Sequence, residues 1–321
     1  MSRFTAALFA TALALSGAQA LAQSWPARPV KLVVGFTPGG GVDINARLLA
    51  SKLTEILGQS VIVENRPGAG TNIANEHVAK SAPDGYTLLI NTAAVAINMS
   101  LYRKPGFDTL RDFAPISVFS ESPNILVVNS AGPLKSLGDL IAAARARPGA
   151  LNFSSAGSGT TQHLSGELLK LRTGTDIVHV PYKGTAPSLT ALIAGEVDFT
   201  FANIPAILQH IKSGRLRPLA TTGGRRAELM PELPTMQEAA VNGVEITVWY
   251  GVLAPAATPH EIVGTLGSAI ARAARSPDIK TRLVEQGAEP VGNTPEEFGK
   301  MLRQEVARWA EVISAARIRA D

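Results

Sequence analysis

Two glycine-rich turns decide how this chain folds: VVGFTPGGGVD at residues 33–43 and LNFSSAGSGTTQH at residues 151–163. Each turn follows a short apolar strand pattern and precedes a helical pattern. The start of a helix presents backbone N–H groups without helical partners, so it attracts an anion without a cationic side chain. Because the turns lie far apart in the sequence, we expect them in different halves of the molecule. They would then face each other across a cleft that closes on a small carboxylate.

Short β-branched segments alternate with amphipathic segments on both sides of Pro123. Strands are predicted before Pro123 at residues 30–36, 61–63 and 86–90, and after it at residues 125–128, 152–153, 177–180, 197–201 and 216–220. Long helical patterns close the chain at residues 259–274 and 295–316. This alternation predicts an α/β fold with a mostly parallel sheet that helices cover on both faces.

The restart of the pattern after Pro123 predicts two lobes. The first lobe is discontinuous and comprises residues 23–122 plus 251–321, and the second comprises residues 123–250. The chain then crosses between the lobes twice, which is an arrangement suited to a hinge.

Residues 1–22 have the pattern of an export signal. Arg3 supplies the positive charge, and residues 4–15 form an apolar segment too short to span a bilayer. Cleavage is predicted after Ala22, with Ala20 as a second possible site. The alternative is an apolar N-terminal helix that is retained. Together with the lack of any later long apolar run, the signal predicts a protein that is secreted into a bacterial periplasm.

Composition excludes several kinds of site. The chain has no cysteine, which excludes disulfides, thiolate metal sites, thiol catalysis and a lipoprotein anchor. Its formal net charge is +4, but the charges are scattered, so we expect no nucleic-acid partner. The five histidines show neither H-x-x-x-H nor H-E-x-x-H spacing, and we therefore predict no metal and no cofactor.

The first turn offers Thr37, Gly39 and Gly40 as anion-binding residues, with Asp43 at the start of the following helix. Glycine permits close approach of a ligand to the backbone. The turn lacks the sequence of a phosphate-binding P-loop or a dinucleotide fingerprint. The alternative interpretation is a tight strand-to-helix turn in which Asp43 only caps the helix.

The second turn offers hydroxyls and backbone groups. Its candidate ligand-binding residues are Ser155, Ala156, Gly157, Thr160 and Thr161. Hydroxyl and N–H groups hold an anion with hydrogen bonds and without chemistry. The alternative function is a periplasmic hydrolase that uses Ser155 or Ser158 paired with His163.

Four further polar residues lie at predicted strand ends, where α/β folds bind ligands. These are Asn91, Thr92, Tyr182 and Asn203. Each has a structural alternative, because Tyr182 would also pack between elements and Asn203 would also cap a helix.

The ordered motifs of the chain resemble the Bug family, the periplasmic solute-binding proteins of tripartite tricarboxylate transporters. The matching segments are WP at 25–26, PGGG at 38–41, VENRPGAG at 63–70, PDGYTL at 83–88, VPYKG at 180–184, GEVD at 195–198 and QGAEPVG at 286–292. The resemblance implies a two-lobe periplasmic binding protein fold of type II, with the ligand cleft between the lobes. It also implies that residues 37–43 and 155–161 hold a ligand carboxylate.

The family further implies a receptor without catalysis that delivers its ligand to the permease subunits of a tripartite transporter. A sensor receptor as the partner stays open. Members often carry an acidic residue near the position of Asn203, and the neutral Asn203 favours a dicarboxylate, or an aromatic or hydroxylated acid, over an amino acid. The expected ligand of the receptor is a dicarboxylate, a tricarboxylate or an aromatic acid. Asn91, Thr92, Tyr182 and Asn203 are then the candidates for specificity.

Overall fold

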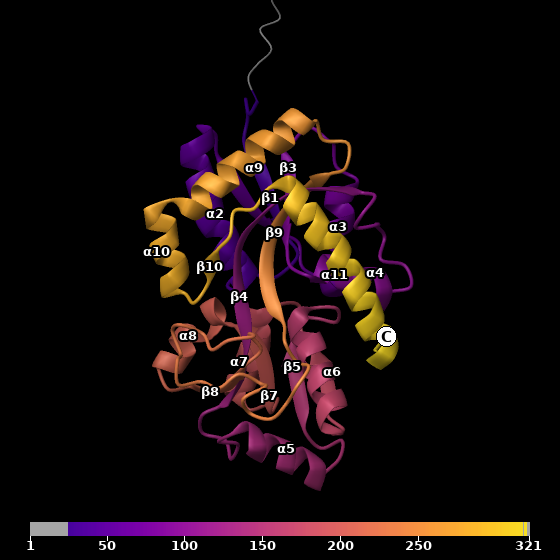
Figure 1. Cartoon of the computed structure of the whole chain (residues 1–321), viewed down its shortest axis with the longest axis vertical. Coiled ribbons are helices and arrows are strands. Elements are labelled where there is room, and N and C mark those ends of the chain that lie inside the picture. The colour runs from indigo at the N-terminus through magenta and orange to yellow at the C-terminus, as the bar shows by residue number, and fades with distance from the viewer. Residues whose placement is uncertain (1–24, 317, 320–321) are drawn as a thin grey trace, which may run out of the picture.

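The computed structural model describes residues 25–316 and 318–319, so the predicted signal peptide lies outside the described residues. Two lobes lie one above the other along the longest axis (Figure 1). Within the described residues, no helix combines the length and the apolar character that crossing a membrane requires.

The first lobe is built on a sheet with the strand order β2-β1-β3-β9-β4. The bounds are β2 Val61–Asn65, β1 Val30–Val34, β3 Thr87–Asn91, β9 Thr247–Pro255 and β4 Phe113–Asn129, with the short β10 Glu289–Pro290 beside β4. β1 pairs in parallel with β2 and β3, whereas β9 is antiparallel to both of its neighbours. All residues of β1 except Lys31 are buried, as expected for a strand covered on both faces.

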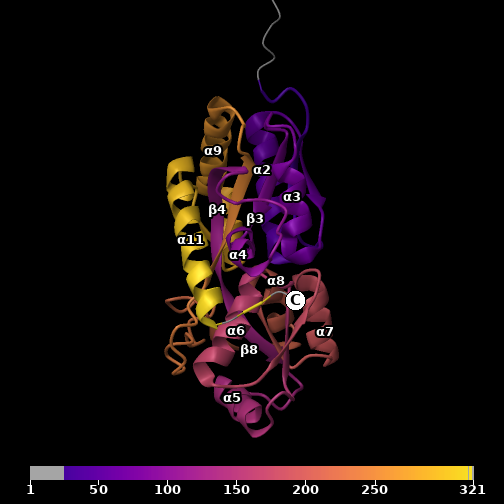
Figure 2. The same cartoon turned by 90° about the vertical axis from the view of Figure 1, so that its right-hand side faces the viewer.

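Helices cover both faces of this sheet (Figure 2). The bounds are α2 Gly41–Leu57, α9 His260–Arg275 and α10 Pro277–Glu285 on one side, and α3 Asn72–Ala79, α4 Ala94–Leu101 and α11 Pro295–Ala316 on the other, with the 3-10 turn η1 Ala69–Thr71 before α3. Leu32 and Val34 pack in the cluster that contains α2 and α9, whereas Val33 packs in the cluster that contains α4 and α11. The alternation along β1 therefore fixes both helix layers.

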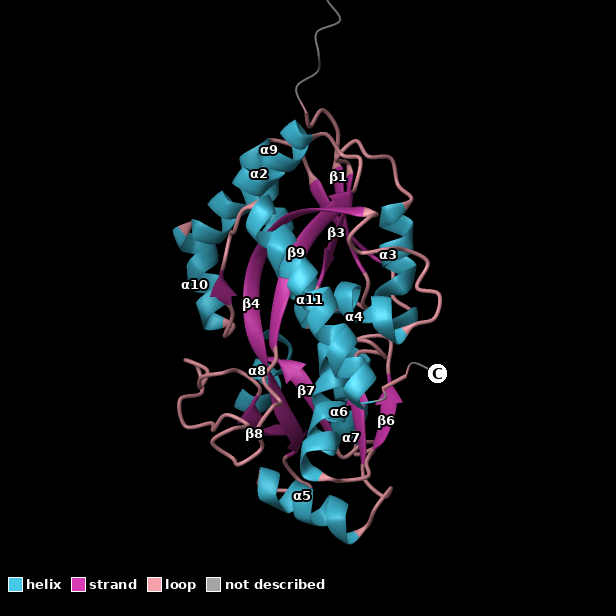
Figure 3. Ribbon diagram, turned by 45° about the vertical axis from the view of Figure 1, so that its right-hand side comes forward, coloured by secondary structure: helices cyan, strands magenta, loops and turns pink. Residues whose placement is uncertain are grey.

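The second lobe repeats this layered arrangement around β7, β5 and β6, which are parallel to one another, and β8. The bounds are β5 Asn152–Ser155, β6 Val178–Pro181, β7 Phe199–Asn203 and β8 Leu216–Thr221, with α5 Leu137–Ala146, α6 Thr161–Thr173, α7 Thr185–Ala194 and α8 Ile204–Lys212. Figure 3 shows these helices around the lower strands, with α5 at the far end.

Two strands join the lobes. β4 is 17 residues long and pairs with β9 up to Pro123, then with β7 from Asn124 onward. β9 carries the chain back from the second lobe to the first. The lobe boundaries predicted after residues 122 and 250 fall within β4 and β9. Proline has no N–H to donate to a sheet, so Pro123 marks the point where β4 changes partners. α11 also reaches the second lobe, because Arg308 donates to the Glu245 carbonyl at 2.9 Å.

Candidate functional site

The N-termini of α2, α6, α7 and α8 meet at one small cavity between the lobes. Its volume is about 20 Å³. The lining residues are Phe36, Gly40, Val42, Thr92, Ala156, Thr160, Thr161, Gln162, Thr185, Asn203 and Val248. The N-terminus of each helix carries roughly half a positive charge, so the cavity collects positive ends from both lobes.

Asp43 organises the first turn from behind. Its carboxylate accepts the Gly39 N–H at 3.0 Å and two hydrogen bonds from Arg47 at 2.9 and 3.0 Å. Asn65 donates to the same carboxylate at 2.9 Å. Burial opposes ionisation of Asp43, but these hydrogen bonds outweigh it and hold the pKa of Asp43 below its usual value. Asp43 therefore fixes the turn, and the N–H groups of Gly41 and Val42 are left without intrahelical acceptors.

The second turn uses most of its own donors internally. Ala156 N–H donates to Gln162 Oε1 at 2.6 Å, and Gly157 N–H donates to Ser155 Oγ at 3.1 Å. Thr160 caps α6, because its hydroxyl accepts the His163 N–H at 3.3 Å. The groups left for an anion are therefore one step further along the chain: the first N–H groups of α6, at Thr161 and Gln162.

Gln162 links two elements of the second lobe at the cavity. It accepts from Ala156, and its Nε2 donates to Thr185 Oγ1 at 2.9 Å. The starts of α6 and α7 are thereby held in one rigid frame. Gln162 and Thr185 were missed from the sequence, and the apolar residues Phe36 and Val248 that close the cavity were missed as well, whereas Val42 lies within the predicted segment 37–43. Gln162 could have been predicted from its place in the sequence, because it is a polar residue at the second position of the predicted helix.

The lobes touch across the cavity. A Cβ atom added to Gly41 would lie 2.1 Å from Asn203 Oδ1 and 2.5 Å from Asn203 Cγ. Asn203 is 3% exposed, and its Oδ1 is buried without a hydrogen-bond partner in the part of the chain that the structure describes. The cleft is therefore closed, and glycine at position 41 is what allows α2 to approach α8 so closely.

The structure brings part of the sequence-predicted set to the cavity. The predicted residues that line it are Gly40, Thr92, Ala156, Thr160, Thr161 and Asn203. Gly157 and Tyr182 line an adjoining cavity of about 230 Å³ instead, which Ala156 shares. Thr37 lies between the lobes, where its N–H donates to the Lys183 carbonyl at 3.3 Å and its hydroxyl is buried.

The remaining predicted residues stand behind the cavity wall. The Gly39 N–H is bound by Asp43 as described above. Asn91 has no exposed surface, and its amide donates to Asn75 Oδ1 at 2.7 Å within the first lobe. Ser155 also has no exposed surface, and its Oγ lies 2.6 Å from His179 Nε2. Gly39 and Ser155 are thus held inside their own turns, whereas the side-chain partners of Asn91 are Thr71 and Asn75, outside both turns.

The serine–histidine pairing expected for the hydrolase alternative differs from the observed one. Ser155 pairs with His179, whereas His163 Nδ1 accepts the Gly159 N–H at 3.2 Å. The reason is that His163 lies one turn into α6 and folds back under the turn. Its ring stacks on His179 with centroids 4.1 Å apart.

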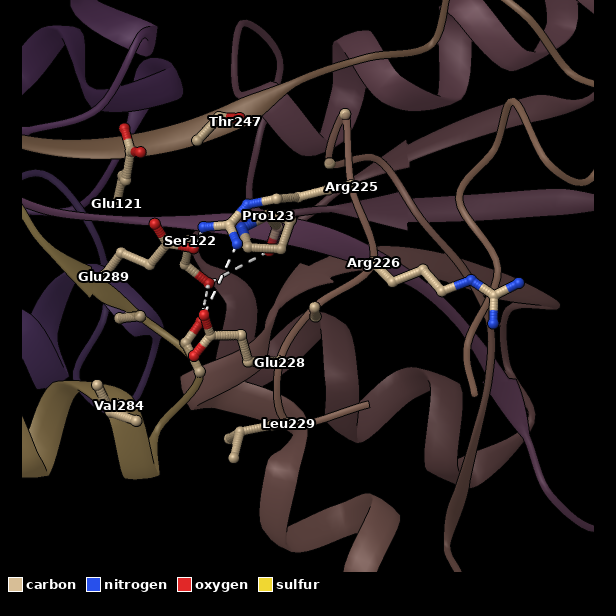
Figure 4. A pocket seen from close by; sticks show the side chains of 15 residues that line it. Glu121, Ser122, Pro123, Arg225, Arg226, Glu228, Leu229, Thr247, Val284 and Glu289 are labelled. Carbon is tan, nitrogen blue, oxygen red and sulfur yellow. Dashed lines mark hydrogen bonds and ion pairs between the residues drawn. The ribbon is translucent and has the colours of Figure 1, made fainter. Parts of the chain in front are cut away.

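A larger cavity of about 370 Å³ lies at the hinge (Figure 4). Arg225 of the second lobe lies 2.5 Å from Glu289 of β10 and 3.6 Å from Glu228, whereas Arg226 points away from this group. Burial and then the charge of Glu289 raise the pKa of the nearby Glu121 above its usual value. The Arg225 and Glu289 side chains are 67% and 50% exposed, so the pair contributes little to stability.

Metal-binding residues do not gather at the interlobe cavity or at the hinge cavity in the part of the chain that the structure describes. In the described ranges 25–316 and 318–319, no group of three or more histidine, cysteine, aspartate or glutamate residues is placed to hold an ion. The chemistry on offer at the interlobe cavity is hydrogen bonding from backbone N–H groups and hydroxyls, which suits an oxygen-rich anion.

Comparison with families and curated relatives gives a consistent result. A family model described as "Tripartite tricarboxylate transporter family receptor" matches residues 45–318. Protein BugT of Bordetella pertussis is 40% identical over 294 residues, covering 91% of this chain and 90% of BugT. The "UPF0065 protein in tcbD-tcbE intergenic region" of Pseudomonas sp. (strain P51) is 37% identical over 314 residues, covering 97% of this chain and 94% of that protein.

Solved structures are similar over nearly the whole described chain. "R. palustris Rpa4515 with adipate" is 43% identical with a TM-score of 0.89, covering 92% of this chain and 99% of that one. MatC from Rhodopseudomonas palustris with bound malate is 32% identical with a TM-score of 0.86, covering 90% and 100%. Periplasmic binding protein BugD is 33% identical with a TM-score of 0.89, covering 92% and 100%. The predicted two-lobe type II periplasmic binding fold is confirmed by these likenesses.

Proposed function

The chain belongs to the tripartite tricarboxylate transporter receptor family, and on that premise we propose that it captures a small carboxylate between its lobes and delivers it to a membrane permease. The observation that carries the proposal is the convergence of helix N-termini from both lobes on one cavity. Such termini favour an anion, and a ligand bound by both lobes stabilises the closed form over the open form.

The ligand-binding groups follow from the free donors of the cavity. The N–H groups of Gly41 and Val42 would bind one side of a carboxylate, and those of Thr161 and Gln162 the other. Asn203 offers a buried amide to a second polar group of the ligand. The named ligands of two similar structures, adipate and malate, are both dicarboxylates, so we infer a dicarboxylate here.

Binding requires the lobes to separate first. A cavity of about 20 Å³ holds on the order of one water molecule, so a dicarboxylate enters only when the lobes separate. After closing, one carboxylate would occupy this cavity and the rest of the ligand would extend toward the adjoining cavity of about 230 Å³. Opening would bend β4 near Pro123 and the segment that enters β9, because these segments join the lobes. We therefore infer a ligand-induced shift between an open and a closed form.

Export by cleavage after Ala22 or Ala20 would place the receptor in the periplasm beside the permease subunits. A non-catalytic role is supported by the partners of His163 and Ser155. Ser155 Oγ lies 2.6 Å from His179 Nε2 and His163 Nδ1 accepts the Gly159 N–H, so within the described residues no hydrogen bond pairs His163 with Ser155 or Ser158. The hydrolase alternative needs such a pair to activate the nucleophile.

The testing experiment is a thermal-shift panel on the mature protein after unfolding and refolding to strip bound ligand. The panel holds adipate, malate, a tricarboxylate, an aromatic acid and neutral amides of the same length. A ligand at about 100 times its Kd adds about 2.7 kcal/mol to the free energy of unfolding, a shift of a few degrees at this size. A shift with acids but not with amides supports the proposal. A panel without any shift by a carboxylate would refute it.

A further inference from the structure

Two histidines, the buried His163 and the half-buried His179, lie directly behind the second turn, outside the set of residues that line the cavity. His163 is on α6 and His179 on β6. Their rings stack with centroids 4.1 Å apart and planes at 22°. Neither is explained by the proposed anion contacts, although both touch the turn that forms one wall of the cleft.

His163 holds the far end of this turn. Its Nδ1 accepts the backbone N–H of Gly159 at 3.2 Å. An N–H group donates to a ring nitrogen only when that nitrogen carries a lone pair, so the proton of the neutral ring lies on Nε2. Nε2 is 4.0 Å from Glu167 Oε1, and the negative charge of this carboxylate favours a proton on Nε2.

His179 holds the near end through Ser155. The Ser155 hydroxyl accepts the Gly157 N–H at 3.1 Å, and Ser155 has no exposed surface, so within the described residues its own proton has a single acceptor within reach. The next partner is His179 Nε2, 2.6 Å away. His179 is then the acceptor at Nε2 and carries its proton on Nδ1.

We propose that His163 and His179 are positioning residues that lock the turn at 155–160 in its ligand-binding shape, each through an unprotonated ring nitrogen and in opposite tautomers. The effect of this lock on ligand binding rests on the proposed function, whereas the tautomers and the shape of the turn do not. The lock engages the N–H groups of Gly157 and Gly159 inside the turn. The N–H groups of Thr161 and Gln162 are consequently the ones presented to the ligand.

The surroundings keep both rings neutral. The charged groups facing them are Glu167 and Lys170 of α6, and the next ring against His179 is Phe153, at a centroid distance of 4.8 Å. Burial lowers the pKa of His163 to about 2, with the neighbouring His179 and Lys170 acting in the same direction. Burial and then Lys170 lower the pKa of His179 to about 4. Protonation of either acceptor nitrogen would break its bond to the turn.

The first test is nitrogen-15 NMR of the histidine rings in the refolded full mature chain, without ligand. Expected at pH 7 are two neutral rings in opposite tautomers, with Nδ1 unprotonated in His163 and Nε2 unprotonated in His179. Both should stay neutral down to pH 5. Identical tautomers, or a ring that protonates near pH 6.5, would overturn the proposal. This result does not depend on any ligand, so it stands or falls separately from the proposed function.

The second test compares matched variants by calorimetry with adipate and malate. His163→Asn and His179→Gln keep an acceptor at the δ and ε positions and lack the titrating ring, and His163→Leu and His179→Leu remove the acceptor. Because one hydrogen bond holds each end, each Leu variant should bind about tenfold more weakly, and the polar variants should stay within about threefold of wild type.

The pH profile separates positioning from general destabilisation. Between pH 7 and 4, wild-type affinity should fall as His179 protonates, whereas His179→Gln should fall less steeply. Equal losses in the Asn or Gln and Leu variants, or a pH profile of His179→Gln that matches wild type, would overturn the positioning role. If a Leu variant does not fold, the affinities of the Asn and Gln variants and the tautomers seen by NMR still test the positioning role.

Discussion

Closing of the cleft should be blocked by a single methyl group at Gly41. This residue is the first of α2 and faces Asn203 of the second lobe, where an added Cβ would lie 2.1 Å from Oδ1 and 2.5 Å from Cγ. Rotation of the amide does not relieve the contact, because Cγ itself is too close. Because Asn203 is 3% exposed and its side chain is enclosed, we expect the lobes to separate by about 1 Å or more to reach ordinary van der Waals contact.

The magnitude follows from the contacts that closure makes. In Gly41→Ala the ligand would lose the N–H groups of one lobe, at least two hydrogen bonds to a charged group. Each is worth about 1.5–3 kcal/mol, so the loss is at least about 3 kcal/mol, or about 100-fold in Kd. In the open form, Gly41→Ala should not lower the free energy of unfolding of the first lobe, because alanine is favoured over glycine in a helix by about 0.5–1 kcal/mol.

The assay is calorimetry with adipate and malate, together with small-angle scattering with and without ligand. Gly264→Ala is the matched control, since Gly264 is also helical and a Cβ there meets nothing within 4 Å. The double variant Gly41→Ala/Asn203→Ala removes the clashing partner and should recover closing in the scattering experiment. Wild-type affinity in Gly41→Ala, or a double variant that stays as open as the single one, would refute the reasoning.

Three further predictions address the turns. Thr161→Val should weaken adipate binding about tenfold in calorimetry with an unchanged melting temperature, because it removes one hydroxyl from the cavity; unchanged affinity would contradict it. Asp43→Ala should lower the free energy of unfolding in urea by about 2 kcal/mol, because Gly39 and Arg47 lose their acceptor; a stable variant would contradict it. The pKa of His179 is lower in the folded chain than unfolded, so stability is retained above pH 6.5 and falls by about 3 kcal/mol toward pH 4. His179→Gln should reduce that fall in urea titrations, and parallel curves would contradict it.

Periodic segments could be predicted from the sequence because their burial is one-sided. The helix expected at residues 295–316 is α11, and the one expected at 259–274 is α9, His260–Arg275. Both carry a regular apolar stripe that one layer of the fold covers. The glycine turns were predictable for a similar reason, since their position between strand and helix places them at the sheet edge.

Other elements could not be predicted because tertiary packing overrides the local pattern. α4 is apolar on nearly all sides and shows no period, since α11, α3 and η1 pack around it. β4 contains Pro115 and Pro123, which argue against a strand, and the structure accommodates them beside a register shift and at the change of partners. The role of Asn91 depends on Asn75, which no local pattern places beside it.

The convergence of helix ends explains why closing should depend on the ligand. The starts of α2, α6, α7 and α8 each bring roughly half a positive charge to one cavity of about 20 Å³. Asp43 sits at the start of α2, but Arg47 balances its charge, so it does not neutralise the cavity. Bringing the lobes together without an anion therefore places like partial charges face to face, and a carboxylate between them converts that repulsion into attraction. Since a ligand shifts an equilibrium only by its differential affinity for the two forms, the charge of the ligand, more than its bulk, should decide whether the receptor closes.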